Sequence, residues 1–550
     1  MNARSVVSAS SCFLLALQLG CESPRLECDS GYCGTLVVVT GAEVGTLLPP
    51  MITDFTDLAL ADLIFQPLAD IGSGLNTTDH LTFSPRLAQS WDFEDPLTLV
   101  FEIHPDAKWH DGQPLTAHDV AFTYSVYTNP EGPYTSFLES IESVTARDDH
   151  TAVFRFNRQH REQFYAATYH MRILPRHILE SVPRDSLRGH RFGANPIGSG
   201  PYRFVRRNAG VSIEIEADTN FYEGRPGIPR MVWRFGSDPN TRMTLLLSEE
   251  ADMLSVIPGP ENVALAQAQE QVNVISYPAN YYGTIVFNLA DPENPTRPHP
   301  VLGDSIVRRA IAMAVDRDQV AQTVLGDSAR APTYPLTAIS RIYQEDGFEL
   351  PFDPDAARAL LDAANYRDTN GDGTRDRNGQ ELEFRMIYPA GSQPRATATA
   401  VIASLLGEIG IVAIPNGIDN GVFRNQQSNG TFDAFLTTWY LQPSPTGIPG
   451  IWGSDGAQNY SSYSNPTVDS LFALAMNESD PEREMAYWGE AFDTMNRDPG
   501  ALWIYRPANY AAIHSRFENV RFRPDRWGAT MWLWRVRDGE WIVRDLEPLP

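Results

Sequence analysis

The sequence predicts an α/β protein built from more than one lobe. Strand-like runs, such as residues 152–156 and 284–288, are interspersed with helical runs, such as residues 304–315 and 481–495. Mixing of these two periodicities along one chain is typical of α/β architecture. The chain has 550 residues, of which 42% are hydrophobic and 20% charged. It is therefore long enough for two or three hydrophobic cores and too apolar to be disordered.

The first 21 residues have the pattern of an export leader. Arg4 supplies the charged end, and residues 12–17 form an apolar core that is too short to span a bilayer. Residues 18–21, Gln-Leu-Gly-Cys, resemble a lipobox, which predicts cleavage before Cys21 and acylation of that cysteine. Acyl chains would hold the protein at a membrane without a transmembrane helix. The alternative is ordinary cleavage, which would release a soluble protein.

Residues 22–34 are predicted to be a tether ahead of the folded part, which begins with the continuous apolar run at residues 36–40. This tether contains Cys28 and Cys33, the only cysteines outside the leader and Cys21. In an oxidising compartment two nearby cysteines favour a disulfide, which here would pin the tether. The pair makes a poor zinc site, because the chain offers it no further cysteine ligand.

The chain is strongly acidic, with a formal net charge of −26 at pH 7. An acidic surface repels phosphate backbones, so nucleic acid is not an expected partner. The sequence also lacks the G-x-S-x-G and H-E-x-x-H patterns of hydrolases and leaves no cysteine for a thiol nucleophile. We therefore do not expect an enzyme, and we expect no cofactor other than a structural calcium ion considered below.

A strand, a tight turn and a capped helix follow one another in residues 97–127. Apolar and other side chains alternate over residues 97–104, which is the period of a strand. Asp111-Gly112 is a turn dipeptide. Thr116 and Asp119 have the spacing of a capping box, so Thr116 is predicted to be the N-cap of a helix.

Residues 109–120, WHDGQPLTAHDV, resemble the signature of the family 5 extracellular solute-binding proteins, which are the peptide, dipeptide and nickel receptors of bacterial ABC importers. The resemblance spans roughly residues 35 to 525. Four further segments match the family pattern in the expected order: PRLAQSW at 85–91, PIGSGPY at 196–202, RRAIAMAVDR at 308–317 and DPDAARALL at 353–361. The resemblance implies a two-lobed periplasmic-binding-protein fold of type II with an extra subdomain, hinged by two crossing strands.

The family layout predicts how the chain is divided. Lobe I would comprise residues 35–83, 196–288 and 504–550, the extra subdomain residues 84–195, and lobe II residues 289–503. The Pro-rich stretch at 291–300 is interpreted as one crossing between the lobes, and the second is expected near Arg506-Pro507. Such a hinge permits closure on a ligand held in the cleft between the lobes.

Aromatic residues supply the candidates for ligand contact, because they offer a wide and rigid contact area to extended or varied ligands. The chain has 11 Trp, 21 Tyr and 26 Phe. Trp439 matches a family Trp in a stretch that often lines the site. The predicted ligand-binding residues are Tyr281, Tyr282, Trp439, Tyr440 and Trp452, with core packing as the alternative for each.

The same stretch departs from the family pattern. Peptide-binding relatives commonly place an Asp shortly after this Trp, where it meets the α-ammonium group of the peptide. Residues 441–445 are Leu-Gln-Pro-Ser-Pro and contain no acid. Since a buried ammonium without a counter-charge is costly, either another carboxylate such as Glu43 or Asp455 substitutes, or the ligand is not a peptide with a free amine.

Residues 368–376, DTNGDGTRD, have the pattern of a calcium loop, in which alternate positions gather hard oxygen ligands. Gly379 replaces the bidentate Glu that an EF-hand carries at its twelfth position. The alternative is a solvated turn whose side chains cap their own backbone. The possible ligands are Asp368, Asn370, Asp372, Thr374 and Asp376.

Taken together, these features predict a monomeric substrate-binding lipoprotein of the periplasm or cell envelope. We expect it to capture a small ligand by hinge closure and to deliver it to the permease subunits of an ABC importer. A peptide is the first choice of ligand, while a metal chelate or an oligosaccharide remains open. The alternative functions are a ligand sensor that presents its closed form to a membrane receptor, and an envelope hydrolase.

Overall fold

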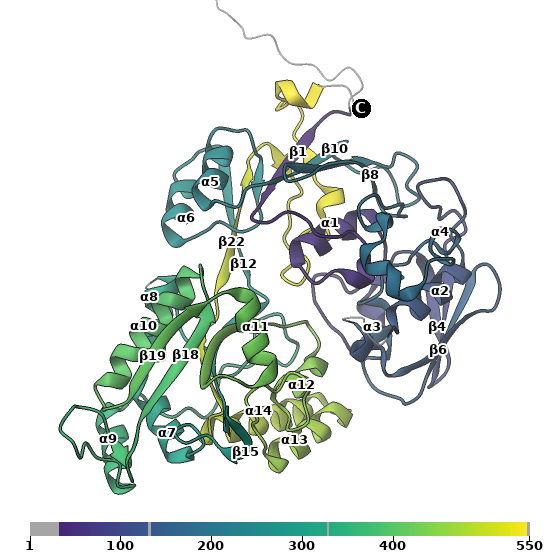
Figure 1. Ribbon diagram of the computed structural model, residues 1–550. Coiled ribbons are helices and arrows are strands. Elements are labelled where there is room, and N and C mark those ends of the chain that lie inside the picture. Colours follow the sequence, from purple (N-terminus) through teal and green to yellow (C-terminus); the bar gives the residue numbers. More distant parts are fainter. Residues whose placement is uncertain (1–31, 130–133, 327–328, 547–550) are drawn as a thin grey trace, which may run out of the picture.

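Three large β-sheets organise the part of the chain that the computed structural model describes, residues 32–129, 134–326 and 329–546 (Figure 1). We call the body around the seven-stranded sheet lobe I, the body around the four-stranded sheet the subdomain, and the body around the five-stranded sheet lobe II. In Figure 1, lobe I lies at the top, the subdomain at the right and lobe II, in green, at the lower left.

The sheet of lobe I has the strand order β12-β22-β11-β1-β10-β9-β8. All six residues of β1 are buried, which explains its continuous apolar run, and β1 pairs in parallel with both β10 and β11. Its strands are β1 (Thr35–Thr40), β8 (Tyr202–Asn208), β9 (Ser212–Ala217), β10 (Arg230–Phe235), β11 (Met253–Leu254), β12 (Val272–Pro278) and β22 (Ala508–His514). Its longer helices are α1 (Phe55–Ile64), α5 (Pro239–Leu247) and α6 (Pro260–Gln267).

The subdomain contains an antiparallel sheet of order β4-β5-β7-β6, which falls inside residues 84–195. Helix α2 packs on β6 and β7, and the capping box predicted at Thr116 and Asp119 is confirmed. One continuous apolar core joins the subdomain to lobe I, since Phe101 and Trp233 belong to the same buried cluster. The elements are β4 (Ala88–Asp95), β5 (Thr98–Ile103), β6 (Ile141–Ala146), β7 (Thr151–Phe156), α2 (Ala117–Tyr127), α3 (Gln163–Thr168) and α4 (Arg176–Leu179).

Lobe II is a three-layer body with helices on both faces of its sheet, whose order is β19-β18-β20-β13-β21. The strands are β13 (Tyr281–Phe287), β18 (Glu383–Pro389), β19 (Val412–Ile418), β20 (Ala434–Tyr440) and β21 (Ala501–Tyr505). One core contains residues of α7 (Ser305–Ala314), α8 (Arg317–Leu325), α9 (Pro354–Ala363) and α10 (Gln393–Gly407). The other contains residues of α11 (Asn420–Asn429), α12 (Ile448–Trp452), α13 (Pro466–Asn477) and α14 (Pro481–Arg497).

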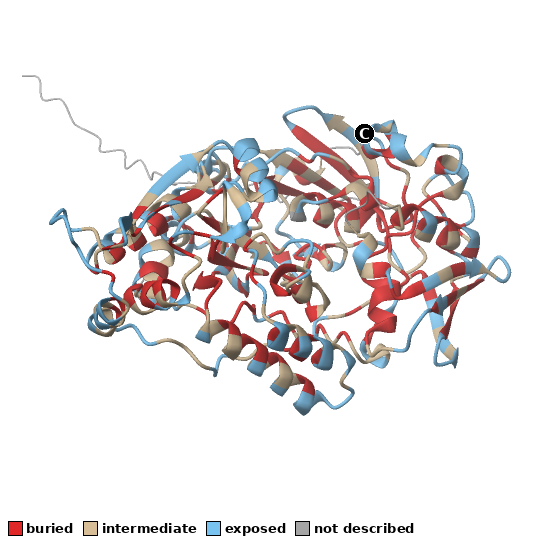
Figure 2. Ribbon diagram, turned by 60° about the horizontal axis from the view of Figure 1, so that its bottom comes forward, coloured by how far each residue is buried: buried red, intermediate tan, exposed pale blue. Residues whose placement is uncertain are grey.

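Buried residues concentrate in the strands and on the helix faces that point toward them (Figure 2).

Four short two-stranded ladders complete the described structure. The ladders pair β2 (Ala69–Asp70) with β3 (Ser84–Pro85), β14 (Ala290–Asp291) with β15 (Asn294–Pro298), β16 (Asp376–Arg377) with β17 (Gln380–Glu381), and β23 (Phe517–Glu518) with β24 (Arg535–Val536).

The described chain passes between the sheets of lobes I and II twice, at residues 279–280 and 506–507. The prediction of a crossing at residues 291–300 is wrong, because these residues form the β14–β15 hairpin within lobe II. The predicted lobe I segment 196–288 is also too long, since β13 pairs with β20 and β21. The proline content that suggested a crossing is also compatible with an exposed two-stranded edge.

The signature turn near Asp111-Gly112 docks on the Gly-rich turn at residues 196–202. The His110 N–H donates to the Gly198 carbonyl oxygen at 2.8 Å, and the Gly198 N–H donates to His110 Nδ1 at 3.2 Å. Nε2 therefore carries the ring hydrogen and donates to the Gly200 carbonyl oxygen at 3.0 Å. Burial lowers the pKa of His110, which favours this neutral ring. We call this contact the His110 clasp.

The Gly-rich turn also lies against the end of α1. The N–H groups of Ser199 and Gly200 donate to the Ile64 carbonyl oxygen at 3.0 and 2.8 Å. A Cβ atom on Gly198 would lie 1.9 Å from that same oxygen. Only glycine fits at position 198, which gives this turn a packing role.

We expect Gly198→Ala to lower the free energy of unfolding by about 2 kcal/mol or more, because the added methyl group collides with backbone atoms that cannot move aside cheaply. The measurement is the apparent unfolding temperature. The matched control is Gly407→Ala at the end of α10, where the added Cβ meets no atom within 4 Å. This control is expected to be neutral or slightly stabilising. Equal unfolding temperatures for the two variants would contradict the steric argument.

Candidate functional site

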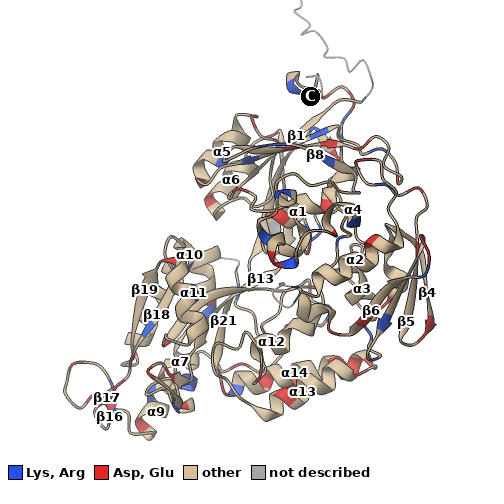
Figure 3. Cartoon of the chain, turned by 45° about the vertical axis from the view of Figure 1, so that its right-hand side comes forward, with Lys and Arg blue, Asp and Glu red and all other residues tan. Residues whose placement is uncertain are grey.

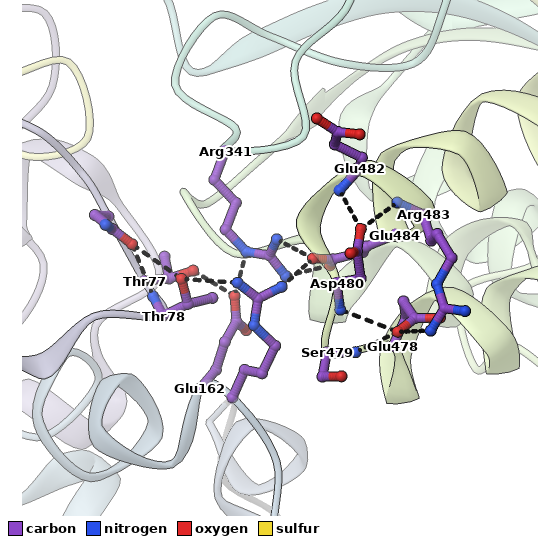
Figure 4. Close-up of polar contacts among 12 residues, drawn as sticks. Thr77, Thr78, Glu162, Arg341, Glu478, Ser479, Asp480, Glu482, Arg483 and Glu484 are labelled. Carbon is purple, nitrogen blue, oxygen red and sulfur yellow. Dashed lines mark hydrogen bonds and ion pairs between the residues drawn. The ribbon is translucent and has the colours of Figure 1, made fainter.

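Four charged side chains bridge the subdomain and lobe II (Figure 4). Arg341, from the loop between α8 and α9, extends between Glu162 at the start of α3 and Glu484 of α14. Its Nε atom lies 2.8 Å from Glu162 Oε1, and its Nη1 and Nη2 atoms lie 2.8 and 2.5 Å from the two oxygens of Glu484. Arg161 adds a contact of 2.7 Å to Glu484 Oε2. We call Arg161, Glu162, Arg341 and Glu484 the interlobe network.

Hydroxyl groups complete the hydrogen bonding of Glu162. The Thr77 hydroxyl donates to Oε1 and the Ser444 hydroxyl donates to Oε2. Ser444 belongs to the stretch of lobe II that lacks the family Asp, so this stretch contacts the subdomain directly. Glu162 therefore receives hydrogen bonds from residues on both sides of the cleft.

The carboxylates of the interlobe network are deeply buried, its arginines are partly exposed, and its charges balance. Glu162 is 5% exposed and Glu484 is 2% exposed, and two arginines face these two carboxylates. Burial acts to lower the pKa of Arg341, but its bonds to Glu484 and Glu162 outweigh that effect and raise it. Arginine pairs most strongly with a carboxylate when two of its N–H groups bond the two carboxylate oxygens, as Arg341 does with Glu484. Elsewhere, Figure 3 shows Asp and Glu residues, in red, distributed over both lobes, in keeping with the net charge of −26.

A cavity of about 310 Å³ lies beside the interlobe network, between the subdomain and lobe II. This volume is within the range of small-molecule sites. We call it the interlobe chamber. Its walls include Phe137, Tyr165 and His170 from the subdomain, and Thr446, Gly450 and Gln458 from lobe II.

Two of the predicted ligand-binding residues, Tyr282 and Trp452, belong to the core of lobe II. They are 0% and 3% exposed, and Trp452 Nε1 donates to the Tyr282 hydroxyl oxygen at 3.1 Å. The prediction that they contact ligand is therefore wrong for this structure. Tyr282 lies on β13, an inner strand of a sheet covered by helices on both faces, where six of the seven residues are buried. Trp452 ends α12 and packs into the same core.

The other three predicted aromatic residues lie at the end of the same sheet. Tyr281 and Tyr440 are directly opposite in the β13–β20 ladder, with ring centroids 5.2 Å apart, and Tyr440 is 52% exposed. Trp439 stacks on Tyr460 at 6.1 Å, and its Nε1 atom is buried without a hydrogen-bond partner among the described residues. Gly450 and Gln458, on the segment that carries Tyr460, line the interlobe chamber. Ligand contact by these three residues stays a prediction.

The carboxylates considered as replacements for the missing Asp lie apart from the interlobe chamber. Glu43 Oε1 accepts a hydrogen bond of 3.0 Å from the Gly210 N–H in the β8–β9 turn of lobe I. Asp455 is exposed in the loop after α12. The acids that do line the chamber include Glu162 and Glu484. Sequence reasoning did not find them, because single charged residues in polar segments carry no signal of burial.

The loop at residues 368–376 favours the turn alternative over a calcium site. Asp368 accepts hydrogen bonds from the N–H groups of Gly371 and Gly373 at 2.6 and 2.9 Å, and Asp372 accepts one from the Thr374 N–H at 2.7 Å. Asp376 accepts one from the Thr369 N–H at 3.0 Å, and Asn370 donates to Asp372 at 2.9 Å. Within the described residues, no three His, Cys, Asp or Glu side chains are grouped so that they could hold a metal ion.

Most predictions for the N-terminus lie outside the described residues. The leader, Cys21 and Cys28 all precede residue 32, whereas Cys33 is described and is disulfide-bonded. None of the helices in the described ranges combines the length and apolar content that a membrane span requires.

Most of the chain is similar to known solute-binding proteins. The family described as "Bacterial extracellular solute-binding proteins, family 5 Middle" matches residues 82–461. The oligopeptide-binding protein AppA of Bacillus subtilis is 27% identical over 461 residues, covering 82% of this chain and 83% of AppA. Di/tripeptide-binding protein 2 of Pseudomonas aeruginosa is 24% identical over 526 residues, covering 89% of this chain and 93% of that protein.

Solved structures share the fold over nearly their full length. AppA of Bacillus subtilis in complex with a nonapeptide has a TM-score of 0.78 and 26% identity, covering 92% of this chain and 99% of that one. NikZ of Campylobacter jejuni in complex with Ni(L-His) has a TM-score of 0.76 and 24% identity, covering 91% and 99%. These structures share the two-lobed α/β architecture of periplasmic binding proteins.

The assignment of Tyr282 to the core can be tested by removing its hydroxyl group. We expect Tyr282→Phe to lower the free energy of unfolding by about 1 kcal/mol, because the buried Trp452 Nε1–H loses its acceptor. Tyr440→Phe is the control and is expected to change stability by less than about 0.5 kcal/mol, since water reaches that side chain. The apparent unfolding temperature reports both effects. No loss of stability in Tyr282→Phe would contradict the assignment.

Proposed function

The chain belongs to family 5 of the bacterial extracellular solute-binding proteins, and we propose that it captures a peptide between its lobes for delivery to an ABC importer. The interlobe network and the interlobe chamber carry this proposal, because both are built from two bodies that the described part of the chain joins only at residues 279–280 and 506–507. A ligand that touches both bodies stabilises their approach. Capture of this kind makes and breaks no covalent bond.

The proposed mechanism is ligand-biased closure. Ligand contacts that exist only in the closed state shift the equilibrium between open and closed forms. The interlobe network also favours the closed form, because Arg341 reaches Glu162 only when the subdomain and lobe II meet. The permease would then recognise the closed form.

A peptide is the ligand class supported by the relatives. AppA and di/tripeptide-binding protein 2 are both named for peptide binding, and AppA was solved with a nonapeptide. Gln442 stands in the stretch where an Asp is expected to meet the peptide amine, and its Oε1 atom is buried without a hydrogen-bond partner among the described residues. We infer that a neutral donor on the peptide meets Gln442.

We further propose that the mature protein is a monomer held at the cell envelope by acylation of Cys21. The Gln-Leu-Gly-Cys pattern at residues 18–21 supports the anchor. The disulfide at Cys33 supports an oxidising compartment outside the cytoplasm.

The ligand itself can be identified by purifying the protein without refolding, denaturing it and analysing the released molecules by mass spectrometry. We expect a mixture of peptides, because a cleft lined by aromatic rings and backbone accepts varied sequences. A single metal chelate or a sugar would contradict the peptide proposal. An empty protein would be reloaded with a nonapeptide mixture, and failure to bind any of it would also count against the proposal.

Arg341→Ala tests whether the interlobe network supports closure. The substitution leaves Glu162 and Glu484 buried without their shared partner in the closed state only, so we expect peptide affinity to fall at least tenfold. Small-angle scattering is expected to show a larger radius of gyration than for the parent protein at the same peptide concentration. The control is Arg147→Ala, which removes an exposed ion pair with Glu94 inside the subdomain. Unchanged affinity and radius in Arg341→Ala would refute this role.

A further inference from the structure

A second cavity, of about 680 Å³, lies beside the two crossings between the lobes. We call it the hinge cavity. Its described lining includes Tyr281, next to the first crossing, and residues 506–507 of the second. It shares no described lining residue with the interlobe chamber, and its volume is within the range of small-molecule sites. The two cavities are therefore separate candidates for ligand contact.

Both lobes form the walls of the hinge cavity. Lobe I supplies residues 256–260, which lead into α6, and residues 508–510 of β22. Lobe II supplies the end of α8 and residues 329–333, which follow it. In Figure 1, α6 lies above α8 on the left of β12 and β22, and the subdomain lies on their right. A ligand in the hinge cavity would therefore touch both lobes, on the side away from the subdomain.

The accessible surface of these walls is largely apolar. Val256 is 45% exposed, and Val263, Val324 and Leu325 are partly exposed. Because water reaches these side chains, an apolar ligand group that covers them is stabilised by the hydrophobic effect. Five of the described lining residues are prolines, which have no N–H group to offer a polar ligand: Pro258, Pro260, Pro332, Pro394 and Pro507.

The charged residues in the described lining of the hinge cavity already have partners. Arg506 Nη2 lies 2.7 Å from Glu345 Oε1, and the Arg506 guanidinium group lies over the Tyr343 ring at 4.8 Å. Arg330 is exposed, and its Nε atom lies 3.9 Å from Asp318 Oδ2. A charged ligand group would have to compete with these ion pairs, whereas an apolar group would leave them intact.

The hinge cavity adjoins the aromatic residues at the end of the lobe II sheet. Tyr281, which lines the cavity, lies opposite Tyr440 with the ring centroids 5.2 Å apart. Tyr440 is 52% exposed and ends β20, so it directly precedes the stretch at residues 441–445. A peptide that lies along this stretch can therefore place one side chain in the hinge cavity.

We propose that the hinge cavity binds a large apolar side chain of the captured peptide, of the aromatic or branched aliphatic class. This side chain packs between residues 256–260 of lobe I and the end of α8 in lobe II. Because it touches both lobes, its burial favours the arrangement in which the two walls face each other across the cavity. This inference rests on the proposed function, since it assigns a specificity to peptide capture.

The test uses nonapeptide libraries in which one position at a time is fixed as Phe, Leu, Gln or Glu and the others are equimolar mixtures. Calorimetry measures the apparent dissociation constant of each library for the intact protein. At one position, Phe or Leu is expected to bind about tenfold more tightly than Gln or Glu, because an apolar side chain gains most from leaving water there. A preference for Gln or Glu, or no preference at any position, would overturn the inference while peptide binding itself stands.

Val256→Asp connects this preference to the hinge cavity. The substitution places a carboxylate on the lobe I wall at a position that water already reaches, so the fold is expected to tolerate it. The advantage of Phe over Gln is expected to fall to near parity, because an apolar ligand group would bury the new charge. The matched control is Val543→Asp, which changes a 73% exposed valine outside the described lining and is expected to keep the full advantage.

A second variant approaches the hinge cavity from the other lobe. Val324→Asp, at the end of α8, is also expected to remove the preference, and the apparent unfolding temperature shows whether this variant folds. Retention of the full preference in Val256→Asp would overturn the inference, whether or not Val324→Asp folds. Release of a non-peptide apolar compound from the parent protein, lost in Val256→Asp, would also overturn it, because the cavity would then serve another ligand. Failure of every library to bind the parent protein would overturn the proposed function and the inference together.

Discussion

The two short passages at residues 279–280 and 506–507 are the constraint on which the rest of the structure depends. They run beside each other, since the Ala279 N–H donates to the Pro507 carbonyl oxygen at 3.4 Å. Among the described residues, the other contacts of lobe II with lobe I and the subdomain are noncovalent and can therefore form and break. The interlobe network is such a contact, and its two carboxylates are buried between the subdomain and lobe II.

Arginine is well suited to this position. Arg341 serves two carboxylates at once through a planar group, so a single side chain satisfies acceptors from both bodies. The network is balanced within itself, because its two arginines face two carboxylates.

Sequence patterns predicted individual strands, caps and turns well. They predicted less well how the chain crosses between the lobes and which aromatic residues are buried. The apolar run at residues 36–40, the capping box at Thr116 and the family motifs can be read from the sequence, because each depends on neighbouring residues. The first crossing was misplaced, since proline content does not distinguish a lobe crossing from an edge hairpin. Tyr282 and Trp452 were misassigned because aromatic side chains suit cores and ligand sites equally. Glu162 and Arg341 became visible only when folding brought together residues separated by 179 positions.

The His110 clasp has a consequence for how the molecule moves. It fastens the signature turn of the subdomain to the Gly-rich turn ahead of β8, and the same Gly-rich turn is bonded to the end of α1. Together with the apolar core that runs through both bodies, these bonds tie the subdomain closely to lobe I. Closure of the described chain would therefore bend residues 279–280 and 506–507, and lobe I would move together with the subdomain.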